Sequence, residues 1–414
     1  MTSATAAIPG FNTGGHSTYS LPTKLTSPPP NPSEPAHIAR AQYDFSTGLL
    51  TGFKDRNGII TQTLYNDPFD RPTQIKSALG TLAENHSAMY YAGLNPLTVF
   101  GVTLTNNDVL TAKDQTSIDD AALRSWTKTD GFGRTTDAFT RDPQGDVKAT
   151  TIYDGLGRTK RVTNPYRSTS DPTYGYTETT YDMIGRVRFV TTYDGSGSPT
   201  GTVTTDYLGS QVTVADQAGK KRRSVTDALG RLKQVIEDPL GLAYSTTYSY
   251  DALDDLTSVT QGAQTRTFFY DSLKRLTQAN NPESLTINYS LYDGNSNLLQ
   301  KTDARGITTT YTYDALNRVT SRSYSDSTPA VVYKYDGQSL PTGAPGSSLF
   351  DRGFSTGRLV AVTYGGTSAG NYTGYDRLGR ANVSFQQTDS QNYKSNSVGR
   401  GQEGSGLSSL TFDL

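Results

Sequence analysis

The stretch Asp303–Arg318, DARGITTTYTYDALNR, decides the fold of this chain. It contains a turn signal (Asp303–Gly306), a run dominated by Thr and Tyr (Ile307–Tyr313) and a second turn signal (Asp314–Arg318). Thr and Tyr suit the pleated surface of a strand. Asp at the head of a turn accepts hydrogen bonds from backbone N–H groups two residues on, and Gly or Asn near its end tolerates left-handed backbone. The stretch therefore predicts a strand, a turn and a strand, which form a hairpin module.

The second turn signal, Asp-x-Leu/Phe/Ile-x-Arg, recurs along most of the chain. Full copies begin at Asp67, Asp130, Asp154, Asp182, Asp227, Asp271, Asp314 and Asp376, and degenerate copies at Asp206, Asp251 and Asp293. From Asp130 to Asp314 the steps are 20 to 28 residues long. Self-similarity at this period indicates supersecondary units that stack on one another, so the sequence predicts a repeat array.

The residues expected to define each module have structural roles in its turns. They are Tyr153, Asp154, Gly157, Arg158, Tyr181, Asp182, Gly185, Arg186, Asp227, Gly230, Arg231, Tyr270, Asp271, Arg275, Tyr313, Asp314, Arg318, Tyr375, Asp376, Gly379 and Arg380. Because Tyr and Arg recur at fixed offsets, we expect guanidinium groups to stack on Tyr rings of adjacent hairpins, at ~0.5–1 kcal/mol per exposed contact.

The signature Tyr-Asp-x-x-Gly-Arg, present as YDGLGR (153–158), YDMIGR (181–186) and YDRLGR (375–380), resembles the YD repeats of bacterial RHS (rearrangement hotspot) proteins. Related repeats occur in insecticidal toxin complexes and in teneurins. The resemblance spans residues 43–385 and implies a spiral β-sheet shell that encloses a C-terminal toxin in polymorphic toxin systems. It also implies a secreted or cell-surface location. The end-of-shell region and the toxin are not visible, so we expect a partial shell that is either a truncated remnant or a separately encoded piece. Its partners would be a cargo polypeptide or the remaining repeats of a larger shell.

The fold class predicted is all-β, a long coiled antiparallel sheet of tandem hairpins that forms a partial cage. About fifteen modules of two strands give about thirty strands, or ~140 Å of sheet at ~4.8 Å spacing. Twisted open sheets rarely exceed ~10 strands without curling, so this sheet must coil on itself.

Three regions are expected along the chain. They are a Pro-rich flexible arm (1–40), the repeat shell (41–385, divergent at 76–128 and with a loop inserted at 338–356) and a poorly ordered Ser/Gly-rich tail (386–414). Within the divergent part, residues 117–124 fit a capped helical turn and a divergent repeat equally well.

Composition excludes several classes of protein. The net charge is −1, so no overall field attracts nucleic acid, and the absence of Cys excludes disulfides and thiolate metal sites. We see no signal peptide and no apolar run long enough for a membrane span. Apolar residues make up only 34% of the chain, which favours a thin polar sheet over a thick core.

The sequence holds few candidates for chemistry. His16, His37 and His86 have no partner at metal-ligand spacing, and we interpret them as solvated loop residues. Asp142 and Asp238 begin Asp-Pro-x-Gly steps like one near the self-cleavage region of some RHS shells, but they are in register with the repeat and favour ordinary turns. The basic run Lys220–Arg223 favours a solvated face of one strand.

These observations predict a non-enzymatic structural protein with no catalytic residues, cofactor or metal. The alternative is a surface adhesin, in which exposed Tyr rings and Asn/Thr rows bind glycans.

Overall fold

The computed structural model describes residues 21–30, 35–44, 46–93, 95–105, 107–336, 353–365, 369–388, 391–396 and 410–412. These residues form an all-β fold in which no residue is helical. The predicted fold class is thus confirmed. The described part of 117–124 contains no helical turn either: residues 115–122 form a turn around the Asp120 carboxylate, which accepts from the N–H groups of Gln115, Thr116 and Ser117.

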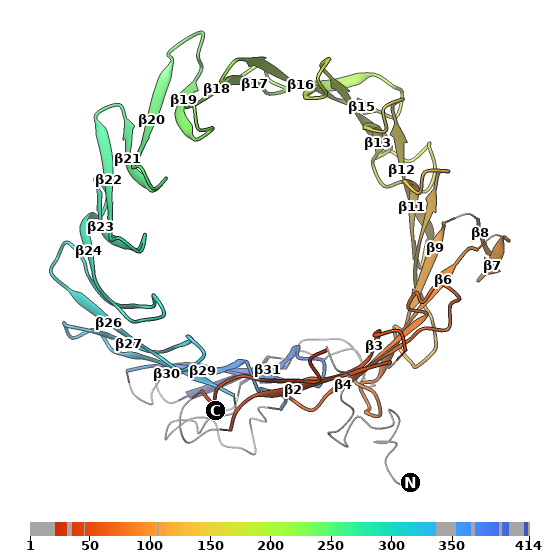
Figure 1. Ribbon diagram of the computed structural model, residues 1–414, viewed down its shortest axis with the longest axis horizontal. Helices are drawn as coiled ribbons and strands as arrows, with labels where there is room; N and C mark the ends of the chain where they lie inside the picture. The colour runs from red at the N-terminus through yellow and green to blue at the C-terminus, as the bar shows by residue number, and fades with distance from the viewer. Residues whose placement is uncertain are drawn as a thin grey trace.

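The strands are short and follow one another closely (Figure 1). The first part of the chain forms β1 (Lys24–Thr26), β2 (Ile38–Tyr43), β3 (Leu50–Lys54), β4 (Ile60–Leu64), β5 (Gln74–Ser77), β6 (Asn85–Tyr91), β7 (Leu97–Val99), β8 (Val102–Leu104), β9 (Val109–Lys113), β10 (Leu123–Thr129) and β11 (Thr135–Asp142). The middle part forms β12 (Gly145–Tyr153), β13 (Thr159–Thr163), β14 (Gly175–Tyr181), β15 (Val187–Asp194), β16 (Pro199–Leu208), β17 (Gln211–Ala215), β18 (Lys221–Thr226), β19 (Leu232–Glu237), β20 (Tyr244–Tyr250), β21 (Leu256–Gln261) and β22 (Gln264–Tyr270). The last part forms β23 (Leu276–Asn281), β24 (Leu285–Tyr292), β25 (Leu298–Thr302), β26 (Thr308–Tyr313), β27 (Val319–Tyr324), β28 (Val331–Tyr335), β29 (Leu359–Tyr364), β30 (Ala369–Tyr375), β31 (Ala381–Thr388), β32 (Gln391–Asn396) and β33 (Leu410–Phe412).

The topology is a simple meander. Thirty-one strands join in one sheet, and each pairs antiparallel with the next along the chain. The exception is the hairpin of β7 and β8, which pair only with each other, so that β6 pairs directly with β9. Because every connection is local, the repeat in the sequence becomes a regular lateral repeat in space.

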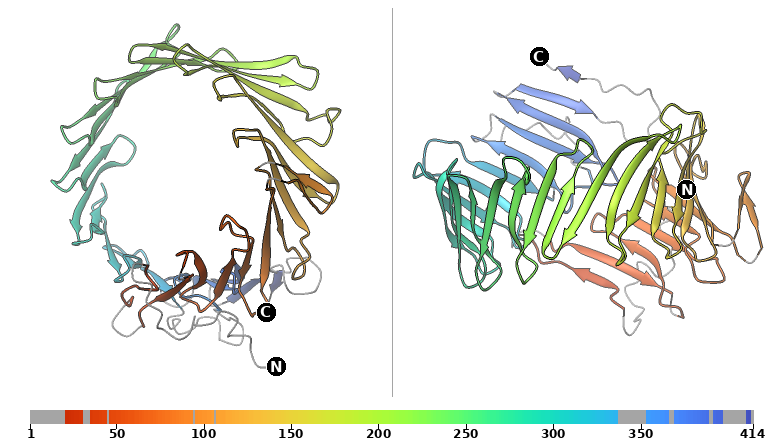
Figure 2. Two further views of the ribbon diagram at one scale, coloured as in Figure 1. Left: turned by 45° about the vertical axis from the view of Figure 1, so that its right-hand side comes forward. Right: turned by 90° about the horizontal axis from the view of Figure 1, so that it is seen from above.

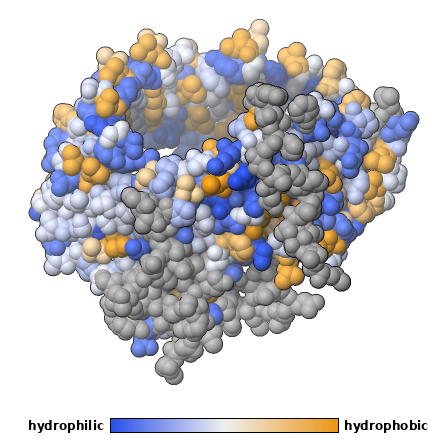
Figure 3. Space-filling model, turned by 60° about the horizontal axis from the view of Figure 1, so that its bottom comes forward, coloured by the Kyte–Doolittle hydropathy of each residue, from blue (hydrophilic) through white to orange (hydrophobic). Residues whose placement is uncertain are grey.

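The sheet coils into a ring-like wall around a hollow, which is open in Figure 1 and visible as a recess in the space-filling view of Figure 3. Seen from the side, the wall also advances along the ring axis, so the N-terminal and C-terminal strands lie at different levels (Figure 2). No strand ladder among the described residues joins β1 to the last strands. The sheet is therefore an open spiral and not a closed barrel, as the sequence predicts.

A bulge recurs once per module and contributes to this curvature. The strand register shifts at the Tyr that precedes the turn Asp, namely at Tyr153, Tyr181, Tyr250, Tyr270, Tyr292, Tyr313, Tyr335 and Tyr375. A bulge bends its strand and increases the local twist. Repetition at the same place in each module bends the sheet repeatedly at the same end of its hairpins.

The wall is a single layer, and most strand residues are only half-buried on it. The largest apolar cluster forms where the β7–β8 hairpin and the end of β6 cover β9 and β10. It contains Ala92, Val102, Leu104, Leu110, Ala112 and Trp126. A smaller cluster of Ala361, Tyr372 and Phe385 spans β29 to β31. The thin wall expected from the low apolar content is thus thickened locally, in the region predicted to be divergent.

The division into arm, shell and tail stays a prediction, but strands extend beyond the expected shell at both ends. β1 lies within the segment assigned to the arm, and β32 and β33 lie within the segment assigned to the tail. Both extensions follow from the sheet itself, because an edge strand offers unpaired N–H and C=O groups to any adjoining segment. Of the inserted loop at 338–356, only residues 353–356 lie within the described residues.

Candidate functional site: the repeat turns and the seam of the spiral

Each Tyr-Asp turn is held by one carboxylate, as the turn between β12 and β13 illustrates. The backbone N–H of Asp154 donates to the carbonyl of Arg158 at 2.8 Å, and the N–H of Gly157 donates to the carbonyl of Asp154 at 3.0 Å. Asp154 Oδ1 accepts from the N–H groups of Leu156 and Arg158, and Oδ2 accepts from Arg158 Nε at 2.8 Å. One side chain therefore fixes both the backbone of the turn and the direction of the Arg.

The Asp–Arg pair of this turn recurs at the other copies whose residues were singled out from the sequence. The Asp–Arg pairs are Asp182–Arg186, Asp227–Arg231, Asp271–Arg275, Asp314–Arg318 and Asp376–Arg380. The predicted Gly residues, Gly157, Gly185, Gly230 and Gly379, all have φ between 79° and 89°. At Asp227, the Arg231 guanidinium and two backbone N–H groups together hold the pKa of the carboxyl below its usual range. The assignment of the signature residues as purely structural stays a prediction that this geometry supports.

Adjacent modules interlock through the Arg of one and the Tyr of the next. Arg158 lies over the ring of Tyr181 at 4.2 Å, and the Tyr181 hydroxyl donates to the Thr159 carbonyl at 2.7 Å. The same stacking joins Arg71 to Tyr91, Arg134 to Tyr153, Arg186 to Tyr207, Arg231 to Tyr250, Arg275 to Tyr292, Arg318 to Tyr335 and Arg358 to Tyr375. The expected stacking between hairpins is thus present, and it links the modules in chain order.

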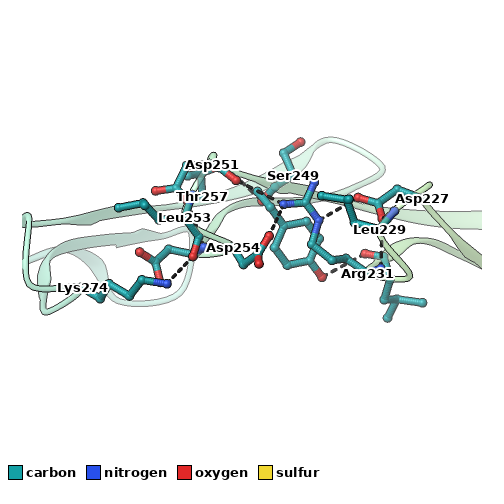
Figure 4. A network of polar contacts seen from close by, with 12 residues as sticks. Asp227, Leu229, Arg231, Ser249, Asp251, Leu253, Asp254, Thr257 and Lys274 are labelled. Carbon is teal, nitrogen blue, oxygen red and sulfur yellow. Dashed lines mark hydrogen bonds and ion pairs between the residues drawn. The ribbon is translucent and has the colours of Figure 1, made fainter.

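Figure 4 shows this link in the middle of the wall. Arg231 Nε donates to Asp227 of its own turn at 2.8 Å, while Nη1 reaches the Asp251 carbonyl and the Asp254 carboxylate of the next turn at 3.2 and 2.7 Å. Asp255 then stands where other copies have Arg, so Tyr270 has no Arg of the preceding turn above its ring. Lys274 instead connects the next turn back to the Leu253 carbonyl.

The predicted signature Gly gives the first testable consequence. Gly157→Val should lower the free energy of unfolding more than Leu156→Val, because φ at Gly157 is +81° and a Cβ there would lie 2.8 Å from Arg134 Nη1. Leu156 is exposed at the tip of the same turn. Left-handed backbone costs an L-residue ~1–2 kcal/mol, and more when the side chain is β-branched. Urea denaturation followed by circular dichroism measures the difference. Equal midpoints would contradict this assignment.

The hairpins end at two edges of the wall, which we name separately. The Tyr-Asp rim consists of the turns with the signature, such as Asp154–Arg158. The opposite rim consists of the turns at the other end of the hairpins, such as Asp55–Gly58 and Asp142–Gly145. The seam is the contact that the opposite rim near the N-terminus makes with the Tyr-Asp rim of β26 to β31, where one turn of the spiral passes beside the next (Figure 2).

Reciprocal hydrogen bonds hold the seam. Asn57 Nδ2 donates to the Thr356 carbonyl at 3.1 Å, and the Thr356 N–H donates to Asn57 Oδ1 at 2.8 Å. The Ala315 N–H donates to the Pro30 carbonyl at 3.1 Å. Farther along, a cavity of about 290 Å³ lies between residues 82–123 of the opposite rim and Leu378 and Arg380 of the Tyr-Asp rim. The two hydrogen-bonded pairs are 285 and 299 residues apart in sequence, and the repeat pattern does not predict them.

A buried polar network crosses the seam at His37. Its Nε2 lies 3.3 Å from Asp336 Oδ1, and its Nδ1 lies 3.5 Å from Arg56 Nη1. Asp336 also pairs with Arg318, which in turn pairs with Asp314 at 2.6 Å. The interpretation of His37 as a solvated residue is therefore wrong: sequence spacing cannot reveal a carboxylate that the coil brings close from almost three hundred residues away. Burial, reinforced by the two Arg residues, lowers the pKa of His37 although Asp336 and Asp314 oppose the shift.

The lowered pKa predicts acid sensitivity of the seam. Because the unfolded chain takes up the His37 proton at a higher pH than the folded chain does, the free energy of unfolding falls as the pH drops below about 6.5. The parent should therefore lose more stability than His37→Gln between about pH 7.5 and about pH 5.5. Urea denaturation at both pH values gives the difference. Parallel losses in the two proteins would contradict the prediction.

His86 is also buried, so its interpretation as a solvated residue is wrong as well. Its two ring nitrogens contact Asp119 and Glu84, each at 2.7 Å. Burial lowers the pKa of His86, but these two carboxylates outweigh burial and raise it. Its contribution to stability is present at low pH and is lost as the pH rises through the folded pKa, opposite in sign to that of His37. His16 lies outside the described residues.

The other sequence candidates occupy ordinary structural positions. Asp142 Oδ1 accepts from the N–H of Gln144, and Asp238 Oδ2 accepts from the N–H of Leu242, as turn residues do. Within the basic run, Arg222 pairs with Glu237 across β18 and β19. The described residues contain no group of three His, Asp or Glu side chains placed to hold a metal ion. They also contain no helix with the length and hydropathy needed to cross a membrane.

The alternative of glycan binding gains no support from this geometry. Sugar-binding platforms need open aromatic faces, whereas most repeat tyrosines, such as Tyr181, lie under a guanidinium group and donate their hydroxyl to a backbone carbonyl. The rings thus serve contacts inside the wall.

Comparison with known proteins agrees with the repeat assignment. The family model for the RHS repeat matches residues 227–266 and 292–329. No curated protein matches the chain in sequence. Among solved structures, that of TcdB2-TccC3 is similar at a TM-score of 0.64 with 15% identity, over 87% of this chain and 22% of that chain. TcdB2-TccC3 without its hypervariable C-terminal region is similar at a TM-score of 0.56 with 12% identity, over 88% and 28%.

At these identities the structural likeness establishes the fold alone, and the chain spans about a fifth to a quarter of the length of those relatives. The family match, in contrast, falls on modules that carry the interlocked Asp, Arg and Tyr, including Asp227–Arg231 and Asp314–Arg318. The repeat signature, the spiral sheet and the family match lead to one conclusion: the chain carries RHS repeats at residues 227–266 and 292–329.

Proposed function

We propose that this protein is a wall segment of an RHS-type shell, a non-enzymatic structural protein that surrounds a polypeptide cargo in a secreted or cell-surface toxin-type system. The observation that carries the proposal is the seam. The wall makes about one turn around a hollow, and the Asn57–Thr356 pair holds its two ends together. A curved sheet whose ends are joined in this way can enclose a chain, which a flat or extended array cannot.

The energetics of the wall suit containment. Each module contacts its two neighbours through backbone ladders, joined in most modules by an Arg–Tyr link, so the stability of the array builds up from nearest-neighbour contributions. The carboxylates and guanidinium groups of the signature turns are engaged in hydrogen bonds and ion pairs, as Asp154 and Arg158 are, which supports a structural role for them. Cargo enters by analogy: TcdB2-TccC3 is a protein with a hypervariable C-terminal region, and we extend a variable cargo of this kind to the present chain.

Protease protection tests the proposal. A compact reporter of about 100 residues is fused after Leu414, and its digestion is followed by gel electrophoresis. The matched control carries Asn57→Ala and Arg318→Ala. The first removes the Asn57–Thr356 hydrogen bond on the opposite rim, and the second removes the Arg318–Asp336 ion pair on the Tyr-Asp rim. We expect slower digestion of the reporter on the parent than on the control, with similar β-sheet circular dichroism for both. Equal digestion of the reporter on the parent, on the control and free in solution would overturn containment.

A further inference from the structure

The Tyr-Asp rim carries a row of exposed apolar side chains that the repeat itself creates. The third residue of each turn, between the Asp and the Arg, points out of the wall. In six turns these residues are Phe132, Leu156, Ile184, Leu229, Leu253 and Leu273, and Leu208, the last residue of β16, lies at the tip of the hairpin between Ile184 and Leu229; all seven are 52% to 87% exposed. Two strands separate adjacent turns, so the row has a spacing of about 10 Å. Extended apolar rows of this kind are uncommon on soluble monomers and mark contact surfaces.

At the seam, another part of the same sheet covers the Tyr-Asp rim. Two Tyr-Asp turns lie at the seam, against the N-terminal strands of the spiral, and there the third residue of the turn is less exposed. Leu316 is half-buried in the turn that bonds to Pro30, and Leu378 is 37% exposed in the wall of the seam cavity. The Asp side chain of the turn is also more buried at the first of these two turns, whereas Asp376 of the second is 18% exposed. Asp314 is 3% exposed, against 18–24% in the five full copies from Asp130 to Asp271. The natural cover of the Tyr-Asp rim is therefore the opposite rim of a repeat sheet.

The chain also has a free surface of the covering type. The opposite rim from β19 to β24 carries Leu240, Leu242 and Leu285, which are 60% to 74% exposed. Both halves of a seam thus exist uncovered on one molecule, on opposite edges of the wall. The net charge of −1 gives little overall repulsion between copies.

We infer that the Tyr-Asp rim from Asp130 to Asp271 is a docking surface for a second copy of this chain, which seats its opposite rim on the rim and continues the seam. The contact is head to tail, since two different edges meet, and such heterologous contacts add further copies instead of closing a dimer. The inference goes beyond containment and does not rest on it: stacked walls would form whether or not the hollow holds cargo.

Sedimentation velocity of the full chain over an about hundredfold range of concentration tests the inference. We expect the weight-average mass to rise from 44.8 kDa towards at least about twice that value. The rim variant Leu156→Gln, Leu229→Gln, Leu273→Gln should remain at the mass of one chain. The control Phe269→Gln, Leu291→Gln removes apolar side chains that are about half exposed on strands, and it should associate as the parent does. A parent that remains monomeric, or a rim variant that associates fully, would overturn the inference.

Crosslinking then tests the polarity of the contact, because the chain has no native Cys. Leu229→Cys marks the Tyr-Asp rim and Leu242→Cys marks the opposite rim, each on separate molecules that are mixed with a flexible bismaleimide. We expect crosslinked pairs from the mixture and few from either variant alone. Pairs formed equally well by Leu229→Cys alone would overturn the head-to-tail arrangement, and binding of a different polypeptide with no self-association would overturn the second copy as the occupant.

Discussion

Arg318→Ala is expected to lower the free energy of unfolding by about 3–5 kcal/mol, the range for breaking a buried ion pair by removing one partner. Arg318 pairs with Asp314 of its own turn and with Asp336, whose side chains are only 3% and 4% exposed. It also lies over the Tyr335 ring at 4.3 Å. Its removal leaves two buried carboxylates without their main cation and exposes the seam at His37. Urea denaturation gives the loss, and hydrogen exchange over residues 35–44 reports opening of the seam.

Arg275→Ala is the matched control. Arg275 holds the same position in its turn, pairs with Asp271 at 2.7 Å and lies over Tyr292 at 4.8 Å, but it takes no part in the seam. Because both side chains of this pair are about a quarter exposed, water screens the remaining charge, and the loss should be smaller. Equal losses for the two variants would mean that the seam adds nothing to the stability of the wall.

Trp126→Ala is expected to cost about 3–5 kcal/mol, as large-to-small changes of buried aromatic side chains do. Trp126 is 4% exposed in the cluster beneath the β7–β8 hairpin and stacks on Phe139 with ring centroids 4.8 Å apart. Truncation would leave a cavity where this hairpin meets β9 and β10. Because Trp126 is the only Trp of the chain, the comparison needs circular dichroism rather than intrinsic fluorescence.

Phe132→Ala provides the contrast for this second prediction. Phe132 follows closely in sequence but is 87% exposed at the tip of a turn. A surface substitution of this type usually changes stability by no more than about 0.5 kcal/mol. If Phe132→Ala were as costly as Trp126→Ala, the rim would already be covered in solution, and if neither were costly, the β7–β8 hairpin would not pack on the wall.

The module was predictable from sequence because its interactions are local. The Asp154 carboxylate accepts hydrogen bonds from residues two and four positions on, and the Tyr181 ring meets Arg158 of the adjacent module. Once these turns alternate with Thr- and Tyr-rich strands, an antiparallel meander and its curling follow from geometry. The signature residues therefore lie together at the turns, and their purely structural role stays a prediction.

The departures lie where packing is not periodic. The β7–β8 hairpin leaves the sheet to bury Trp126, and β32 extends the wall into a segment read as a tail. Whether such a segment forms a strand depends on the strands and side chains against which it packs, and these are distant in sequence. Burial of His86 likewise depends on Asp119, which an irregular turn brings to it.

By itself the sequence determined the repeating hairpin, the all-β class and the link from each Arg to the next Tyr. Tertiary structure alone decided that Asn57 meets Thr356 and that His37 is buried against Asp336. The physical reason is accumulation: small bends and twists of successive modules add up over the coil, and only their sum fixes which turns lie side by side.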